Sequence, residues 1–193
     1  MKTSLFMLWV AGVATGCMSG HPERPQDPFP PGERVIFCFA QNADLGRWEI
    51  QNDGSGDSRP HGELSINEAG NAVFSGSLSR EADGGFSAMQ HEFEPIDVPN
   101  CRAVVLGLKG DGRAYQLRVA GRPNDRLAFA CDFQTSGCWQ TVEVPFTNLI
   151  AIQRGPCLDP LCFPGQVLAQ IQLLAANGTT ESFRLEIDKI WLE

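Results

Sequence analysis

Apolar and polar residues alternate along the chain from Arg34 onward, which is the pattern of β-strands that are buried on one side. The alternating runs cover residues 34–40, 62–79, 84–93, 101–121, 126–133, 138–146 and 181–193. Glycine, proline, asparagine and aspartate interrupt these runs at intervals of roughly 8–12 residues. About ten strands at this spacing predict an all-β protein, folded as an antiparallel β-sandwich.

The phase of the alternation predicts which side chains share the core. Run 62–79 reads as two strands joined by a turn at residues 68–71. In the last run the phase shifts by one residue, which predicts a β-bulge near Asp188. The residues predicted to face inward are Ala72, Phe74, Leu78, Val104, Leu106, Leu108, Tyr115, Leu117, Val119, Leu127, Phe129, Cys131, Phe133, Val142, Val144, Phe146, Phe183, Leu185, Ile187, Ile190 and Leu192.

One segment, residues 165–176, fits two secondary structures. Val167, Ile171 and Leu174 form a helical stripe, whereas Val167, Ala169, Ile171 and Leu173 fit a strand equally well. Periodicity alone does not separate the two for a short apolar run.

A Gly-Asp-Gly sequence at residues 110–112 lies between two of the alternating runs, flanked by Lys109 and Arg113. A phosphate-binding loop needs a longer glycine pattern followed by a helix, and a calcium loop needs several carboxylates at short fixed spacing. Neither pattern is present here. Since Asp-Gly readily takes the positive φ of tight turns, the sequence predicts a β-hairpin.

The first 33 residues predict an export signal and a spacer. Lys2 precedes a short apolar run, and residues 14–17, Ala-Thr-Gly-Cys, resemble the lipobox of bacterial lipoproteins. The resemblance implies a signal peptide over 1–16 and lipid on Cys17, and Met18 after the cysteine implies the outer membrane of the cell envelope. The alternative is an ordinary signal peptide with Cys17 incidental. Residues 17–33 are proline-rich and predict an extended tether, followed by one sandwich domain over 34–193.

The net charge of −8 argues against nucleic acid as a partner, because nucleic-acid binding needs a basic surface. Besides Cys17, an even set of cysteines in an exported chain predicts three disulfides. Short loops favour Cys131–Cys138 and Cys157–Cys162, which leaves Cys38–Cys101. The cysteines and three histidines lack the ligand spacing of zinc sites, and no cofactor is predicted.

Several segments in order resemble the complex I intermediate-associated protein 30 family. They are Trp48 with Asn52-Asp53-Gly54, and the runs FSGSLS from Phe74, GGFSAM from Gly84, LKGDGRAYQLRV from Leu108, CWQTVEVPF from Cys138 and FRLEIDKIWL from Phe183. The resemblance spans about Arg47 to Leu192. The chain departs from the family pattern after Asp53. The loop runs NDGSGDSRPHG from Asn52 and is shorter than the usual Val-Met-Gly-Gly continuation, without its Val-Met pair.

The resemblance implies a jelly-roll β-sandwich of the galactose-binding-like type and a non-catalytic role. Mitochondrial relatives assist assembly of respiratory complex I, so an exported member is expected to be an assembly or chaperone-like factor for an envelope protein. The candidate binding residues are Trp48, Asn52, Asp53, Lys109, Asp111 and Arg113.

The alternative function is carbohydrate binding, since aromatic faces of Trp48, Trp139 and Trp191 could stack on sugar rings if they are exposed together. The opposing interpretation buries these tryptophans in the core. A hydrolase would need His61 or His91 beside a serine in a pocket, and a calcium site could form from Asp53, Asp57 and Asp83. The simpler interpretation is that the histidines are solvated and that the aspartates are solvated carboxylates of turns.

Overall fold

The computed structural model describes residues 34–53, 60–78, 85–122, 127–153, 161–176 and 181–193. The predicted signal peptide and tether lie outside these residues. Within them, no helix is both long and apolar enough to span a bilayer. The elements are β1 (Arg34–Cys38), β2 (Trp48–Asp53), β3 (His61–Ile66), β4 (Ala72–Leu78), β5 (Phe86–Asp97), β6 (Ala103–Lys109), β7 (Ala114–Ala120), β8 (Leu127–Gln134), β9 (Trp139–Pro145), the 3-10 helix η1 (Phe146–Asn148), β10 (Ile150–Gln153), β11 (Val167–Ala175) and β12 (Glu181–Leu192).

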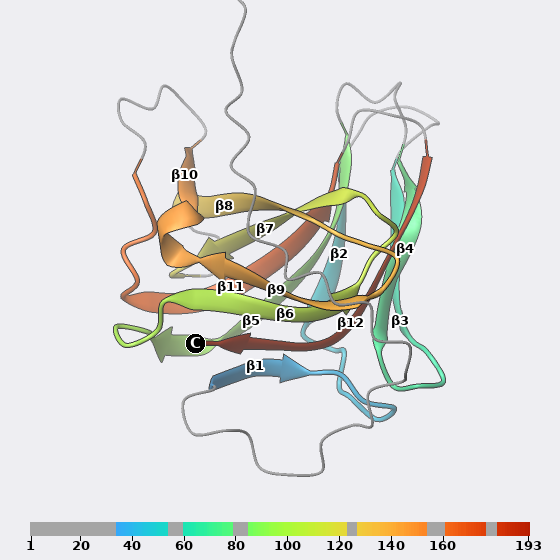
Figure 1. Cartoon of the computed structure of the whole chain (residues 1–193), viewed down its shortest axis with the longest axis horizontal. Coiled ribbons are helices and arrows are strands. Elements are labelled where there is room, and N and C mark those ends of the chain that lie inside the picture. The colour runs from blue at the N-terminus through green and yellow to red at the C-terminus, as the bar shows by residue number, and fades with distance from the viewer. Residues whose placement is uncertain (1–33, 54–59, 79–84, 123–126, 154–160, 177–180) are drawn as a thin grey trace, which may run out of the picture.

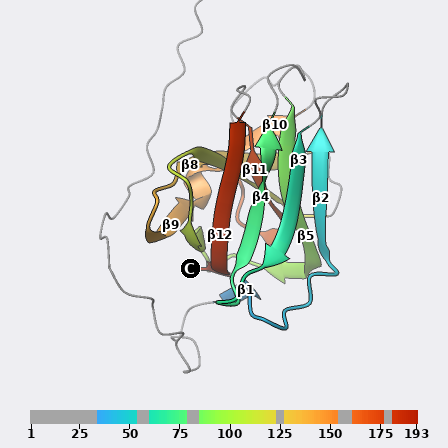
Figure 2. The same ribbon diagram turned by 90° about the vertical axis from the view of Figure 1, so that its right-hand side faces the viewer.

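The strands form two antiparallel sheets that pack face to face. The first sheet has the order β3-β4-β12-β6-β9, and β1 also pairs with β12. The second has the order β10-β8-β7-β11-β5-β2. In Figure 1 the strands β9, β6, β12 and β1 of the first sheet lie in front of the second. The turned view in Figure 2 places β2 and β3, the edge strands of the two sheets, beside each other. The predicted jelly-roll β-sandwich is confirmed.

The Gly-Asp-Gly turn connects the two sheets, so the predicted hairpin at this position is wrong. β6 pairs with β12 and β9, whereas β7 pairs with β11 and β8. Gly110 lets the chain pass against Thr135, because a Cβ at Gly110 would lie 2.2 Å from the Thr135 Oγ1 atom. Gly112 supplies a φ of 89°, which glycine adopts at little cost.

The core lies between the sheets and contains the side chains that the alternation assigned to it. The ambiguous segment forms strand β11, with Ile171 and Leu173 fully buried. The predicted bulge is confirmed by a register shift between Ile187 and Lys189 in the pairing of β12 with β6. The sequence did not predict strands β2 and β10. Both are edge strands of the second sheet, and both border residues whose sequence is typical of loops.

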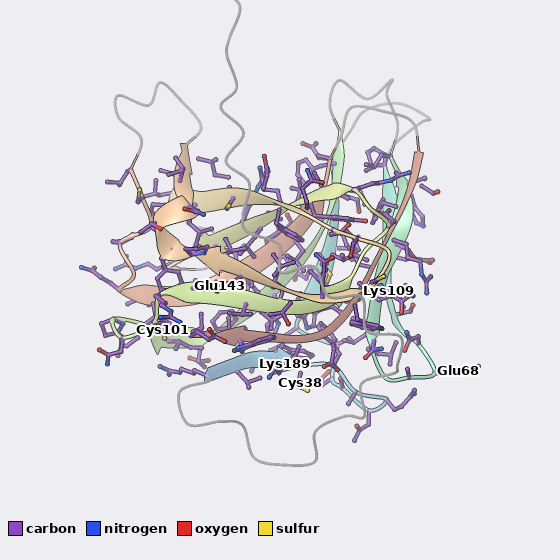
Figure 3. The ribbon with its side chains drawn as sticks, in the orientation of Figure 1. Cys38, Glu68, Cys101, Lys109, Glu143 and Lys189 are labelled. Carbon is purple, nitrogen blue, oxygen red and sulfur yellow. The ribbon has the colours of Figure 1, made fainter. Side chains whose placement is uncertain are left out.

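The predicted disulfide Cys38–Cys101 is not present, and the register explains why. Cys38 lies opposite Lys189, whereas Arg102, next to Cys101, donates its backbone N–H to the carbonyl of Glu193. Four residues of extended strand separate those two positions, about 13 Å. A disulfide needs its Cα atoms within about 7 Å. Figure 3 shows the two cysteines well apart.

Cys131 and Cys138 are likewise not joined. The Cys131 side chain packs against the core from β8, and burial raises the pKa of its thiol. Cys138 precedes β9, which belongs to the other sheet. The third predicted pair, Cys157–Cys162, includes Cys157, which lies outside the described residues.

Candidate functional site

Glutamine side chains gather on the outward side of the sheet β10-β8-β7-β11-β5-β2. On each of these strands alternate residues enter the core, and the residues between them face away from it. The strand registers align the outward residues of neighbouring strands in rows, for example Glu49, Gln90, Gln172 and Arg118. We call this surface the amide face, and its glutamines are Gln51, Gln90, Gln116, Gln134, Gln170 and Gln172.

Three of these glutamines form a hydrogen-bonded chain across β2, β5 and β11. Gln172 Nε2 donates to Gln51 Oε1 at 3.0 Å, and Gln51 Nε2 donates to Gln90 Oε1 at 3.0 Å. Gln90 Nε2 donates in turn to Glu92 Oε1 at 3.2 Å. Gln90 and Gln172 are only 4% and 8% exposed, so the chain is held in a fixed orientation. Each amide keeps a second N–H, because an amide carries two donors and the network uses one.

Arg118 occupies the centre of the amide face on β7. Its Nε donates to Gln116 Oε1 at 2.6 Å, and Gln116 Nε2 donates to Asp132 Oδ1 at 2.8 Å. The guanidinium carbon lies 5.6 Å from the centre of the Phe86 ring, a cation–π contact. Burial lowers the pKa of Arg118, and the nearby Asp132 charge opposes that effect.

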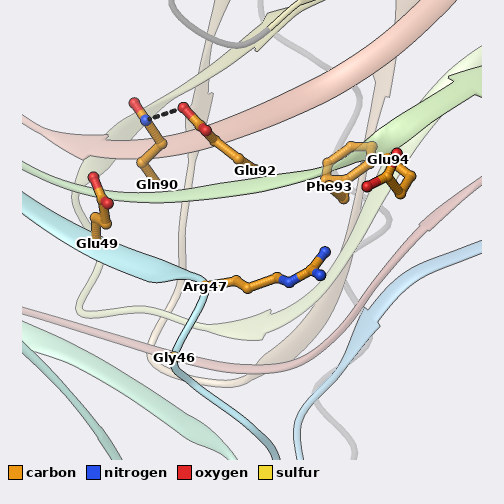
Figure 4. A pocket seen from close by; sticks show the side chains of 7 residues that line it. All are labelled: Gly46, Arg47, Glu49, Gln90, Glu92, Phe93 and Glu94. Atoms are coloured by element: carbon orange, nitrogen blue, oxygen red, sulfur yellow. Dashed lines mark hydrogen bonds between the residues drawn. The ribbon is translucent and has the colours of Figure 1, made fainter.

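The two ends of the amide face differ in polarity. At the β2–β5 end, a pocket of about 390 Å³ is lined by carboxylates and one arginine (Figure 4). At the other end, Ile150 and Ile152 on β10 are each 37% exposed. The face therefore passes from acidic through amide to apolar. The pocket residues are Gly46, Arg47, Glu49, Gln90, Glu92, Phe93 and Glu94.

Trp48, a predicted binding residue, is buried on the core side of β2. Its ring stacks on that of His91, with centroids 4.7 Å apart and planes 14° from parallel, and Phe37 meets both rings edge-on. Trp191 is also buried, and Trp139 is half-buried. Within the described residues, the tryptophans therefore do not form a shared exposed surface on which a sugar ring can stack.

Asn52 and Asp53 end β2, where the two sheets meet. Asn52 Oδ1 accepts hydrogen bonds from the backbone N–H of Gly62 at 3.0 Å and from Ser87 Oγ at 2.8 Å. Gly62 belongs to β3 in the first sheet and Ser87 to β5 in the second, so Asn52 ties the sheets together. Asp53 is exposed beside it, paired in register with Phe86.

Asp111 and Arg113 lie in a separate pocket, on the first sheet. Asp111 Oδ2 accepts from the Tyr115 hydroxyl at 3.2 Å and from the backbone N–H of Arg184 at 3.0 Å, and it pairs with Arg113 Nε at 3.5 Å. Lys109 precedes the turn at the end of β6 (Figure 3). The pocket, about 470 Å³, is lined by Glu63, Ser75, Gly76, Asp111, Arg113, Ser182, Phe183 and Arg184.

The predicted binding residues therefore divide into three places. Trp48 is in the core, and Asn52 and Asp53 are at the junction of the sheets. Asp111 and Arg113 line the second pocket, and Lys109 ends β6 just before them without lining it. Sequence reasoning missed the amide face. Its signal was present as glutamine on the polar phase of several strands, but only the sheet order places those strands side by side.

The histidines do not form a hydrolase site among the described residues. His91 is 4% exposed, its Nδ1 lies 3.1 Å from the carbonyl of Arg47, and burial lowers its pKa. His61 is exposed and lines neither pocket described above. No group of three histidine, cysteine, aspartate or glutamate residues in the described ranges is placed to hold a metal ion. Two members of the weighed calcium site, Asp57 and Asp83, lie outside those ranges.

Residues 37–187 match the model of the protein family Complex I intermediate-associated protein 30 (CIA30). The chain belongs to this family. The match covers most of the sandwich and confirms the resemblance carried by the separate sequence segments. Among curated proteins, no match was found.

Solved structures with the same fold include carbohydrate-binding modules. The family 11 module of the cellulosomal cellulase Lic26A-Cel5E of Clostridium thermocellum has a TM-score of 0.60 at 15% identity, covering 83% of this chain and 94% of the module. The same module in complex with a β-1,3-1,4-mixed-linked tetrasaccharide has a TM-score of 0.59 at 15% identity, with the same coverage. The agarase AgWH50C has a TM-score of 0.56 at 12% identity, and the match covers 84% of this chain and 24% of the agarase. At these identities the likeness concerns the fold.

Proposed function

We propose that this protein is a non-catalytic binding module and that its amide face binds a glycan. The observation that carries the proposal is the fixed chain of glutamines across β2, β5 and β11. Sugars present many hydroxyls, each of which donates and accepts hydrogen bonds. An ordered row of amides with unused N–H groups suits such a ligand without large rearrangement.

The alignment of the outward residues also favours an extended ligand. The aligned rows cross the sheet from β2 to β10, so a chain of several sugar units can lie across them. The sandwich of the family 11 module, which was solved with a tetrasaccharide, supports the same idea by analogy of fold. Because the described tryptophans offer no stacking platform, hydrogen bonds have to provide most of the affinity and specificity.

A direct test is affinity electrophoresis through gels that contain soluble polysaccharides. The panel includes mixed-linked β-glucan, polygalacturonate and hyaluronan. Glycan binding retards the wild-type chain in at least one gel, and Gln51→Ala combined with Gln172→Ala removes the retardation. Thr141→Val, on the exposed side of β9 in the other sheet, is the matched control and keeps it. No retardation by any polysaccharide, or equal retardation of the double variant, contradicts the proposal.

We propose further that the protein acts in the bacterial cell envelope, held by lipid on Cys17. The support is the lipobox-like sequence at residues 14–17 and the proline-rich stretch after it. Mass spectrometry of the purified full-length protein tests this, since lipidation adds acyl mass to a new N-terminus at Cys17. Cys17→Ala shifts the protein from the membrane to the soluble fraction. Membrane retention of Cys17→Ala would contradict the anchor.

The second candidate function is assembly of an envelope protein complex. Its support is membership in a family described as complex I intermediate-associated, together with the pocket beside Asp111. Crosslinking in intact cells followed by mass spectrometry tests it. Recovery of one stoichiometric complex, lost in Lys109→Glu/Arg113→Gln, favours assembly. Asp111 is kept in this variant because it holds the turn in place. Recovery of polysaccharide without a stoichiometric protein favours glycan binding.

A further inference from the structure

Arg118 is the one cationic side chain in the middle of the described part of the amide face, and neighbouring residues fix its position. Gln116 accepts from Nε at 2.6 Å and Phe86 lies beneath the guanidinium at 5.6 Å. These contacts use one of the five guanidinium N–H donors. The two terminal nitrogens, with four donors, remain for a ligand.

The charge of Arg118 has no direct carboxylate partner within the described residues. Asp132 is the nearest influence on its pKa, but Asp132 accepts from Gln116, which stands between the two charges. The ion pairs of the described chain involve Arg102, Arg113 and Arg184 instead. Holding a half-buried cation without an anion costs stability, and a bound anion would recover that cost.

The geometry points to recognition of a carboxylate. A guanidinium with both terminal nitrogens available binds a planar carboxylate through two parallel hydrogen bonds. Gln172 lies beside Arg118 in the register of β11 with β7, and its amide has a second N–H that can donate to a hydroxyl of the same ligand. We propose that Arg118 reads the carboxylate of a uronic-acid unit, so that the glycan is acidic. This inference rests on the proposed glycan-binding function.

The net negative charge of the protein makes the predicted recognition of an acidic glycan depend on Arg118. With a net charge of −8, the chain repels a polyanion at long range. Glu49, Glu92 and Glu94 line the pocket on β2 and β5, at least two strands from β7, and the nearer carboxylate, Asp132 on β8, accepts a hydrogen bond from Gln116. Recognition must therefore be local and depend on one arginine. A general basic surface would instead tolerate its loss.

The test compares two acidic polymers with neutral forms of the same backbone. Polygalacturonate and hyaluronan are each used as such and after reduction of their carboxylates to alcohols. Titration calorimetry of the full-length protein is expected to give binding about 10- to 100-fold tighter for at least one acidic polymer than for its reduced form, the range of a charge-assisted bidentate pair. Arg118→Met keeps the alkyl stem over Phe86 and is expected to abolish this preference.

Two further variants make the result interpretable. Arg118→Lys keeps the charge but not the bidentate geometry, so it is expected to retain only part of the preference. Arg184→Met, in the other sheet, is the control and keeps all of it. Binding of neutral glycans alone, or an unchanged preference in Arg118→Met, overturns the carboxylate inference and leaves the proposed function standing. Binding of no glycan overturns both.

Discussion

Removing the Asp111 carboxylate should loosen the turn between the sheets and change the ionisation of Tyr115. The Asp111 Oδ2 atom accepts from the Tyr115 hydroxyl and from the Arg184 backbone. A hydrogen bond to a charged acceptor is worth about 1.5–3 kcal/mol. The Tyr115 donor is buried and would lose its partner at full cost, whereas Arg184 is exposed and its N–H can turn to water. We therefore expect Asp111→Ala to lower the free energy of unfolding by about 3 kcal/mol, measured by urea unfolding with tryptophan fluorescence.

The chain has a single tyrosine, so absorbance at 295 nm reports Tyr115 alone. Burial raises the pKa of Tyr115 well above its usual value of about 10, and Asp111 raises it further by its charge and hydrogen bond. Because the folded state holds the phenol proton more tightly than the unfolded state, stability is full below about pH 10 and falls as the pH rises above it.

In the wild-type chain, phenolate absorbance should therefore appear only as the protein unfolds in alkali. In the Asp111→Ala variant, the Tyr115 phenol should ionise at a lower pH, while the protein is still folded. Asp111→Asn is the matched control, because it keeps an acceptor and removes the charge. A wild-type tyrosine that titrates reversibly near pH 10 with the fold intact would refute the reasoning.

Three other predictions concern the core, the sheet junction and the turn. Because burial lowers the pKa of His91, its contribution to stability is full above about pH 6.5 and falls by up to about 1.4 kcal/mol per pH unit below that value. His91→Phe should remove this loss of stability at low pH, measured by urea unfolding at several pH values from 5 to 7.5. His61→Ala is the control and should keep the loss. Asn52→Ala strips an acceptor from Gly62 and Ser87 and should cost about 1–3 kcal/mol in unfolding free energy, with Asn52→Asp much milder. Gly110→Ala forces a Cβ against Thr135 and should cost about 1–3 kcal/mol, while Gly137→Ala, which meets nothing within 4 Å, should be near neutral. Equal stability of Asn52→Ala and Asn52→Asp would contradict the hydrogen-bond argument for Asn52. Equal stability of Gly110→Ala and Gly137→Ala would contradict the packing argument for Gly110.

Much of the fold follows from local pattern, because a strand that is buried on one side must alternate. The inward residues of β6, β7 and β8 and the bulge in β12 were readable for that reason. Pairing is a different matter. Nothing local in Gly110–Arg113 tells a hairpin from a crossing between sheets, since both need a positive φ and a short polar loop. The disulfide prediction failed similarly, because Cys38 and Cys101 were paired by elimination without knowledge of register.

The candidate site shows the same limit more sharply. Gln51, Gln90 and Gln172 lie on three strands that are distant in the sequence. Each glutamine alone is an ordinary outward residue of its strand. The order β7-β11-β5-β2 brings them into one hydrogen-bonded chain, and that order depends on the whole jelly-roll topology. The conspicuous residues, Trp48 and Asn52, proved to have contacts that hold the sandwich together.

The central claim is that the amide face is the binding surface, and NMR spectroscopy tests it most directly. The experiment records ¹H–¹⁵N spectra of the labelled protein during titration with oligosaccharides of the polymer that retards it most in electrophoresis. The account predicts that the side-chain amides of Gln51, Gln90 and Gln172 and the Nε–H of Arg118 shift together and saturate. Shifts confined to Lys109–Arg113, or the absence of saturable shifts on the amide face, would contradict it.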